Sequence, residues 1–386
     1  MKSLKSAALL SLALSSGPAF AQETDGFEAP QGIFAPATKL SYDRTKLQPE
    51  GNLISGLWYS QAEGASVSLG IEQDKLFGTD EEFRLGIEAS KYTQTAQITL
   101  IDPDFFESVY SRQLSFSTYN IRPNRSQNGS YSFSGAEVSI GFGRQLTEAF
   151  SFSFGTGISK SRIQNDPNLP TFIQNYITLE GEDKTSFFGF LNLFYDSTDG
   201  DPYPQSGYRL GLANKLGLIG DTTYIKSQIS ATYFTRATDR VGVKVHGNLG
   251  YADTIGTGTF PIYENFFAGG PGSVRGYAQN TLGPTSTIPG QTSLAQAGGK
   301  LRVTGGVELA MRIGDRDDLV MLGFYDFGSA FAEPGDFRSS ELRSSAGLGV
   351  RWHSPIGPLN LYLTHALNDE AGDKLETVQF TLGARF

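Results

Sequence analysis

The stretch LRVTGGVELAMR, residues 301–312, shows the pattern that decides the fold. Apolar side chains at Leu301, Val303 and Val307 alternate with polar ones, and the same alternation ends the chain at 378–386. Successive side chains of a β-strand point to opposite faces of the sheet, so a period of two predicts strands with one apolar face. The pattern recurs along the chain in segments of about ten residues, and the sequence therefore predicts an all-β protein.

Sixteen such segments are found, an even number as in the closed antiparallel barrels of bacterial outer membranes. The predicted strands are 53–59, 64–72, 82–91, 95–101, 108–118, 132–142, 149–160, 184–196, 206–217, 223–236, 240–250, 298–311, 317–328, 342–353, 357–367 and 376–386. Short connections between them read as periplasmic turns. We expect the longer connections 119–131, 161–183 and 252–297 to be extracellular loops.

The composition excludes several classes of protein. The chain has 386 residues, 31 Lys and Arg against 40 Asp and Glu, a formal net charge of −9 and no cysteine. Without cysteine there is no disulfide framework, zinc–thiolate site or thiol nucleophile. An acidic chain is a poor nucleic-acid binder, so no nucleic-acid partner is expected.

The N-terminal residues have the pattern that is typical of a secretory signal peptide. Lys2 and Lys5 precede an apolar run at 7–14, and Ala19 and Ala21 flank a small-x-small cleavage signature. We expect a cleaved signal peptide at residues 1–21. A short lead-in at 22–51 and a barrel at 52–386 then complete the expected organisation.

Period-two strands suit either a soluble sandwich, with its apolar face inward, or a membrane barrel, with its apolar face on lipid. Export, strands repeated over most of the chain, and an aromatic C-terminus at Phe386 favour the membrane barrel. In lipid the sheet must close, because an open edge would expose unpaired backbone groups. The sequence therefore predicts a sixteen-stranded antiparallel transmembrane β-barrel in the bacterial outer membrane.

The connection 252–297 is long enough to suggest a function of its own. It contains FFAGGPGSVRGY at 266–277, in which Arg275 stands among glycines and apolar residues. If this loop folds back into the lumen, the guanidinium is desolvated and needs an acidic partner.

This loop resembles the signature loop of the BamA/TamA outer-membrane assembly superfamily, also called surface antigens. The residues that carry the resemblance are Gly269, Gly270, Ser273, Val274, Arg275, Gly276 and Tyr277, followed by Leu282, Gly283 and Pro284. Segments 73–79, 204–207, 262–267, 324–328 and 352–359 are also similar to family segments, so the resemblance covers roughly 52–386.

The resemblance implies roles for individual residues. Arg275 would point from the tucked loop to the inner wall, where Asp326 is its family-matched partner and Glu308 could share it. Phe380 and Phe386 would belong to a C-terminal signal read by the cell's assembly machinery. A kink at Gly383 would weaken pairing between the last and first strands, giving a seam that could template an incoming strand.

By resemblance, the expected function is insertion, assembly or translocation of proteins at the outer membrane, without chemistry. Expected partners are outer-membrane lipids, nascent outer-membrane proteins and a separate periplasmic chain. Only about 30 residues lie between the signal and the barrel, so we expect none of the family's periplasmic POTRA domains. The alternatives are a passive pore, or the membrane half of a complex with a separate periplasmic module.

An enzyme is not expected. The three histidines, His246, His353 and His365, lie on different predicted strands without metal-ligand spacing. There is no Gly-x-Ser-x-Gly elbow and no phosphate-binding loop. The sequence thus predicts no catalytic residue, no metal and no cofactor.

Overall fold

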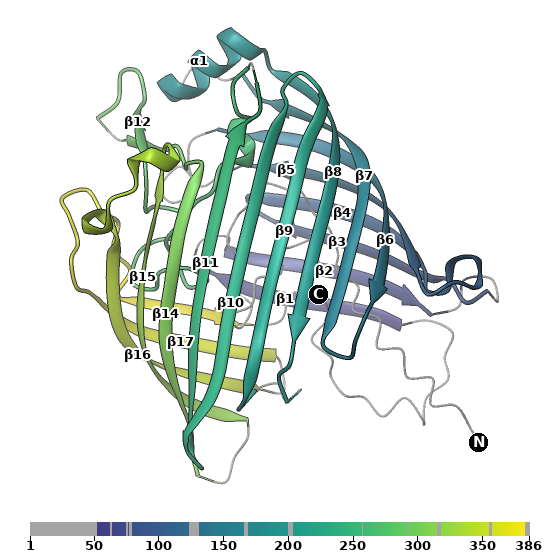
Figure 1. The fold of residues 1–386 in the computed structure, drawn as a ribbon. Helices are drawn as coiled ribbons and strands as arrows, with labels where there is room; N and C mark the ends of the chain where they lie inside the picture. Colours follow the sequence, from purple (N-terminus) through teal and green to yellow (C-terminus); the bar gives the residue numbers. More distant parts are fainter. Residues whose placement is uncertain are drawn as a thin grey trace, which may run out of the picture.

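Sixteen strands form one closed antiparallel barrel in the computed structural model (Figure 1). Each strand pairs with its neighbour in sequence, β11 pairs with β14, and β18 returns to β1. The prediction of an all-β, sixteen-stranded antiparallel barrel is confirmed. The structure describes residues 52–61, 64–74, 76, 79–122, 131–165, 169–199, 204–256, 258–292, 294–314, 318–354 and 357–382.

The barrel strands agree with the predicted ones to within a few residues. They are β1 (Asn52–Ser60), β2 (Gly64–Gln73), β3 (Glu82–Ser90), β4 (Thr93–Asp102), β5 (Ser111–Ile121), β6 (Phe133–Gln145), β7 (Phe150–Ile163), β8 (Asp183–Asp196), β9 (Gly207–Gly220), β10 (Tyr224–Thr238), β11 (Val241–Thr254), β14 (Leu301–Arg312), β15 (Leu319–Phe331), β16 (Arg343–Ser354), β17 (Gly357–Ala366) and β18 (Val378–Leu382). The predicted signal peptide 1–21 and lead-in 22–51 lie outside the described residues, as do Gly383 and Phe386.

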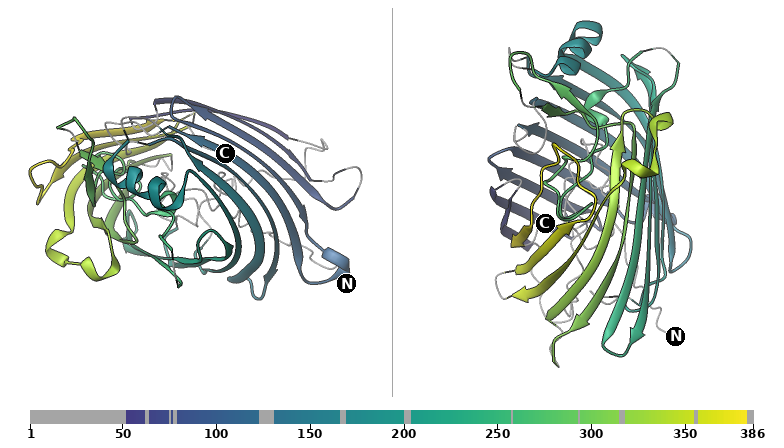
Figure 2. Two further views of the ribbon diagram at one scale, coloured as in Figure 1. Left: turned by 90° about the horizontal axis from the view of Figure 1, so that it is seen from above. Right: turned by 90° about the vertical axis from the view of Figure 1, so that its left-hand side faces the viewer.

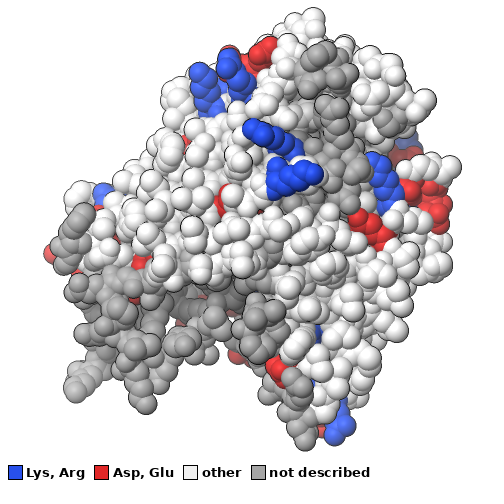
Figure 3. Space-filling view, turned by 180° about the vertical axis from the view of Figure 1, so that it is seen from behind, with Lys and Arg blue, Asp and Glu red and all other residues white. Residues whose placement is uncertain are grey.

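The faces of the strands show which side of the sheet is apolar. In β2, Val67 and Leu69 are 46% and 50% exposed, whereas Ser66 and Ser68, which alternate with them, are each 1% exposed. Figure 3 shows one side of the molecule on which uncharged side chains cover a broad area, with Lys and Arg gathered toward its upper end. Apolar outward and polar inward is the arrangement of a membrane barrel and the reverse of a soluble sandwich.

Two of the expected loops contain regular structure that was not predicted. The loop expected at 161–183 contains helix α1 (Thr171–Glu180), and the loop expected at 252–297 contains a hairpin of β12 (Thr285–Thr287) and β13 (Leu294–Gln296). Helix α1 lies at one end of the barrel, inside the outline that the strands form when seen from above (Figure 2). A helix of this length is marginal alone, so its tertiary contacts must stabilise it.

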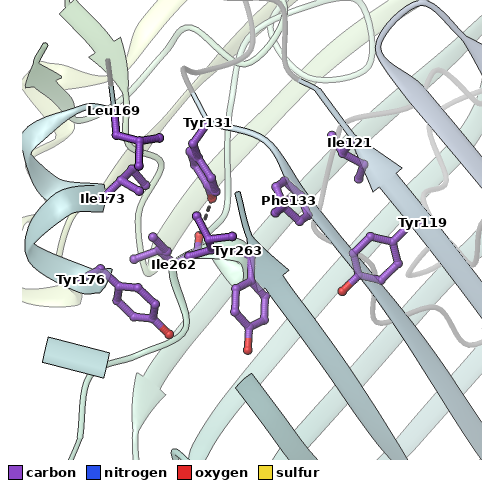
Figure 4. Packing of buried hydrophobic residues seen from close by; sticks show 10 residues of the cluster. Tyr119, Ile121, Tyr131, Phe133, Leu169, Ile173, Tyr176, Ile262 and Tyr263 are labelled. Atoms are coloured by element: carbon purple, nitrogen blue, oxygen red, sulfur yellow. Dashed lines mark hydrogen bonds between the residues drawn. The ribbon is translucent and has the colours of Figure 1, made fainter. Parts of the chain in front are cut away.

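Those contacts form an apolar cluster (Figure 4). Ile173 and Tyr176 of α1 are buried against residues from the ends of β5, β6 and β7 and from the connection after β11. The Tyr131 hydroxyl donates a hydrogen bond of 3.3 Å to the Ile262 carbonyl. The cluster consists of Tyr119, Ile121, Tyr131, Phe133, Ile163, Leu169, Ile173, Tyr176, Ile262 and Tyr263. It therefore fastens the start of the β11–β14 connection to the neighbouring loops.

Among the described residues, no helix is both long enough and apolar enough to span a membrane.

Candidate functional site

The connection between β11 and β14 makes a tight turn at its glycine pair. Gly269 and Gly270 have φ angles of +100° and +97°, a region that favours glycine. A Cβ on Gly270 would also collide with the Gln279 side chain. The Gly269 amide donates to Ser273 Oγ at 3.3 Å, and the Gly270 amide donates to the Val274 carbonyl at 3.2 Å. Through this turn Arg275, the residue after Val274, reaches β14 and β15.

Arg275 is bound by two carboxylates on the buried face of these strands. Its Nε and Nη2 donate to the two carboxylate oxygens of Asp326 at 2.7 and 2.9 Å, and its Nη1 donates to Glu308 Oε2 at 2.8 Å. The Arg275 backbone amide also donates to Asp326 Oδ2, at 3.2 Å. All three residues are at most 4% exposed. The fork of the guanidinium allows this bidentate contact, which a lysine could not make.

Further contacts complete the surroundings of the guanidinium. It lies 3.6 Å from the ring centroid of Phe324 and 5.1 Å from that of Tyr362, so both rings add cation–π attraction. Arg351 Nη2 lies 3.6 Å from Glu308 Oε1. Two carboxylates and two guanidinium groups therefore lie together on the buried face of this wall. We call Arg275, Asp326, Glu308 and Arg351 the arginine cluster.

The two residues after Arg275 contact other strands of the same wall. The Gly276 amide donates to Gln379 Oε1 at 3.1 Å, and Gln379 Nε2 donates to the Tyr277 carbonyl at 2.8 Å. The Tyr277 hydroxyl donates to the Ser344 carbonyl at 3.2 Å. Sequence reasoning missed Gln379, although its position on the polar side of the last strand is a signal that could have found it.

A second buried set of charges holds the start of the connection. Glu264 is 2% exposed and accepts hydrogen bonds from Lys215 of β9 at 2.9 Å and Lys226 of β10 at 2.8 Å. Tyr224 OH donates to it at 3.4 Å, and Glu137 of β6 lies 3.6 Å from Lys215. We call Glu264, Lys215, Lys226 and Glu137 the lysine cluster.

The lysines determine the ionisation of Glu264. Burial raises the pKa of this carboxyl, but Lys215 and Lys226 lower it further than burial raises it, so the pKa lies below its ordinary value. Sequence reasoning placed Glu264 in a segment of resemblance but assigned it no role. The signal available was one acidic residue in the largely apolar run 260–268, together with lysines on two neighbouring strands.

The structure brings most of the predicted site residues together. Gly269, Gly270, Ser273, Val274, Arg275, Gly276 and Tyr277 lie on one continuous segment against Asp326 and Glu308. Phe380 lies apart from them, where its ring stacks on that of Tyr59 with centroids 5.1 Å apart.

The described residues include no group of three or more His, Cys, Asp or Glu side chains placed to hold a metal. His246, His353 and His365 lie on β11, β16 and β17.

Comparison with known proteins identifies the family. The model of the Omp85 superfamily domain matches residues 75–386, which is most of the chain. The chain belongs to the Omp85 superfamily. The resemblance to the BamA/TamA type is thereby confirmed, and this family together with the barrel fold indicates the outer membrane as the location.

Individual relatives support the same assignment. The outer membrane protein assembly factor BamA of Neisseria meningitidis serogroup B is 27% identical over 377 residues, covering 87% of this chain and 47% of the relative. The BamA of Neorickettsia risticii is 25% identical over 357 residues, covering 89% of this chain and 46% of the relative. The chain thus spans about half the length of these relatives.

A solved structure shows the same fold. The crystal structure of BamA from Haemophilus ducreyi lacking POTRA domains 1–3 superimposes with a TM-score of 0.78 at 22% identity, covering 88% of this chain and 71% of that one.

Proposed function

We propose that this Omp85 barrel assists the insertion, assembly or translocation of proteins at the outer membrane, and that it acts through the seam between β1 and β18. The family and the relatives named as assembly factors support the general function. The observation that carries the proposal is that the barrel closes by pairing of its first strand, β1, with its last, β18.

On one edge, β1 pairs with β2 along its whole length, from Asn52 to Ser60. On the other, β1 pairs with β18 and so closes the barrel, with Tyr59 opposite Leu382 and Ser60 opposite Thr381. If β18 separates from β1, the backbone groups along this edge of β1 become available, and such an edge can accept an incoming strand by β-augmentation. Outer-membrane protein clients present such strands, so the seam would template them.

The predicted roles of the C-terminal residues belong to this proposal. Gly383 would kink the last strand and so weaken the seam, and Phe380 and Phe386 would form the signal by which the barrel itself is inserted. The stacking of Phe380 on Tyr59 supports a position at the seam for the first of these aromatic rings.

The glycine–arginine segment would act as a lock. We propose that residues 269–277 are folded into the lumen, where the contacts of Arg275 with Asp326 and Glu308 hold the segment against the wall. Buried on the inner side of β14 and β15, the ion pairs would keep this wall rigid while the seam moves.

Export and location complete the proposal. Residues 1–21 would direct the chain through the inner membrane and be cleaved before Gln22, and outer-membrane lipids would surround the apolar outer face. Mass spectrometry of the barrel from purified outer membranes tests this, since a mature protein that retains residues 1–21 contradicts it.

The decisive experiment uses a disulfide across the seam. The chain has no cysteine, so Ser60→Cys with Thr381→Cys creates a unique pair at residues that already face each other. Proteoliposomes with the reduced variant should accelerate folding of an added outer-membrane barrel, and oxidation should abolish the acceleration until reductant is added. Acceleration that survives oxidation contradicts the role of the seam, and no acceleration in either state contradicts an insertase.

Two other outcomes would favour the alternatives. Stable conductance in planar bilayers without acceleration of folding would favour a passive pore. A periplasmic chain that copurifies from native membranes, and whose addition is required for acceleration, would favour a complex with a separate periplasmic module.

A further inference from the structure

Three consecutive residues of the loop bind two different parts of the barrel wall. Arg275 is held by Glu308 of β14 and Asp326 of β15. Gly276 and Tyr277 instead contact Gln379 of β18, the strand at the seam. Because a peptide backbone between adjacent residues cannot stretch, this segment ties β18 to β14 and β15 across two intervening strands.

The backbone before β18 joins the same connection. The Glu376 amide donates to the Gly276 carbonyl at 2.9 Å, and the Ala278 amide donates to the Lys374 carbonyl at 2.8 Å. Gly276 fits here because its φ is +90°, and a Cβ would lie 3.2 Å from Thr364 Oγ1 and 3.3 Å from Ser345 Cβ. The loop therefore approaches the wall closely at this point.

Gln379 is the only side chain of β18 that reaches the loop among the hydrogen bonds of the described residues. It is 0% exposed, and both ends of its amide are used. The oxygen accepts from Gly276, while Nε2 donates to the Tyr277 carbonyl and, at 3.1 Å, to Glu376 Oε2. Any movement of β18 away from the loop would leave a buried amide and its loop partners without hydrogen bonds, which is costly.

Gln379 lies close to the seam between β18 and β1. Thr381, which pairs with Ser60 of β1, is two residues further along β18 and lies on the same face of that strand. A displacement of β18 from β1 that also carries Gln379 away from the loop would break these hydrogen bonds.

We propose that Gln379 is a latch, a positioning residue through which residues 276–277 of the loop hold the seam strand in place. This proposal rests on the proposed function. It adds that opening of the seam between β1 and β18 depends on the loop. Releasing it would loosen the attachment of β18 to the loop while leaving the contacts of Arg275 intact.

Backbone hydrogen exchange tests the latch directly, because protection reports the population of the locally open state. In Gln379→Ala, loss of the two hydrogen bonds to the loop should speed exchange of β18 and β1 amides by roughly tenfold, with β8 to β10 unchanged. Gln97→Ala is the matched control. Gln97 is 3% exposed on the buried face of β4 and bonds to Thr99, away from the loop.

A second variant covers the case in which Gln379→Ala does not fold. Gln379→Glu keeps the volume and the acceptor for Gly276, but it cannot donate to Tyr277 and it faces Glu376. It should speed exchange in the same segments. Unchanged exchange of β18 in a folded variant, or equal acceleration in Gln97→Ala, overturns the latch.

The outcome is independent of client folding. If exchange changes as expected but wild-type barrels fail to accelerate folding of a client, the latch stands and the proposed function fails. If wild-type barrels accelerate folding but exchange is unchanged, the proposed function stands and the latch fails.

Discussion

The two buried charge clusters hold the same loop with opposite arrangements of charge. In the arginine cluster the loop contributes the cation, Arg275, and the strands contribute Asp326 and Glu308. In the lysine cluster the loop contributes the anion, Glu264, and the strands contribute Lys215 and Lys226. The first lies on β14 and β15 and the second on β9 and β10, so the loop is anchored on two separate parts of the wall.

The difference between the clusters concerns geometry more than charge. Arg275 binds Asp326 through a planar fork with two parallel hydrogen bonds, and it stacks on Phe324. Each lysine binds Glu264 through a single ammonium group. The arginine cluster therefore specifies orientation more strongly than the lysine cluster. The comparison predicts that the arginine cluster contributes more to stability.

The largest effect is expected for Arg275→Ala, which leaves Asp326 buried without the guanidinium that binds both of its oxygens, although Glu308 keeps Arg351 at 3.6 Å. The free energy of unfolding should fall by about 3–5 kcal/mol, measured by urea titration in lipid vesicles. Arg275→Lys is the control for charge alone, and it should recover only part of this loss because it cannot make the bidentate contact. Wild-type stability in both variants would refute the lock.

A smaller effect is expected for Glu264→Ala. Lys215 keeps Glu137 at 3.6 Å, so only part of the positive charge is left uncompensated. We expect a loss of about 3 kcal/mol in the same titration, at the lower end for a broken buried ion pair. A loss greater than that of Arg275→Ala would reverse the ranking of the two clusters.

The contribution of Glu264 should also depend on pH. Since its pKa in the folded protein is below the ordinary 4.5, the unfolded chain binds more protons, and the stabilisation is complete above that value. It should diminish as pH falls below 4.5 toward the lowered pKa of the folded protein. The stability difference between wild type and Glu264→Gln should therefore shrink on acidification, and a difference that widens would contradict the ionised state of Glu264.

The smallest effect is expected at an accessible ion pair of the same connection. Lys300 lies 2.9 Å from Glu333 and 3.3 Å from Asp253, but the two carboxylate side chains are 54% and 39% exposed. Lys300→Ala should cost about 1 kcal/mol or less, and the cost should vanish in high salt. A loss comparable to that of Glu264→Ala would show that burial does not explain the difference between sites.

Local patterns predicted most of the barrel. The alternation in 301–312 identifies β14, and similar alternation identified all sixteen barrel strands, because side-chain period follows directly from strand geometry. The pattern did not predict helix α1, whose stability depends on burial of Ile173 and Tyr176 by residues distant in sequence. The pairing of Arg275 with Asp326 was expected from resemblance, since it joins residues 51 positions apart.

The sequence by itself determined the all-β class, the number of strands and the identity of the glycine–arginine segment 269–277. Each of these depends only on the types and the order of residues that are close together in the chain. Only the tertiary structure decided that Glu264 meets two lysines and that Gln379 meets the loop. Gln379 and Gly276 are 103 positions apart, and their contact depends on barrel closure and on the path of a long connection. Such contacts follow from how the strands are arranged in space, which no periodicity of the chain encodes.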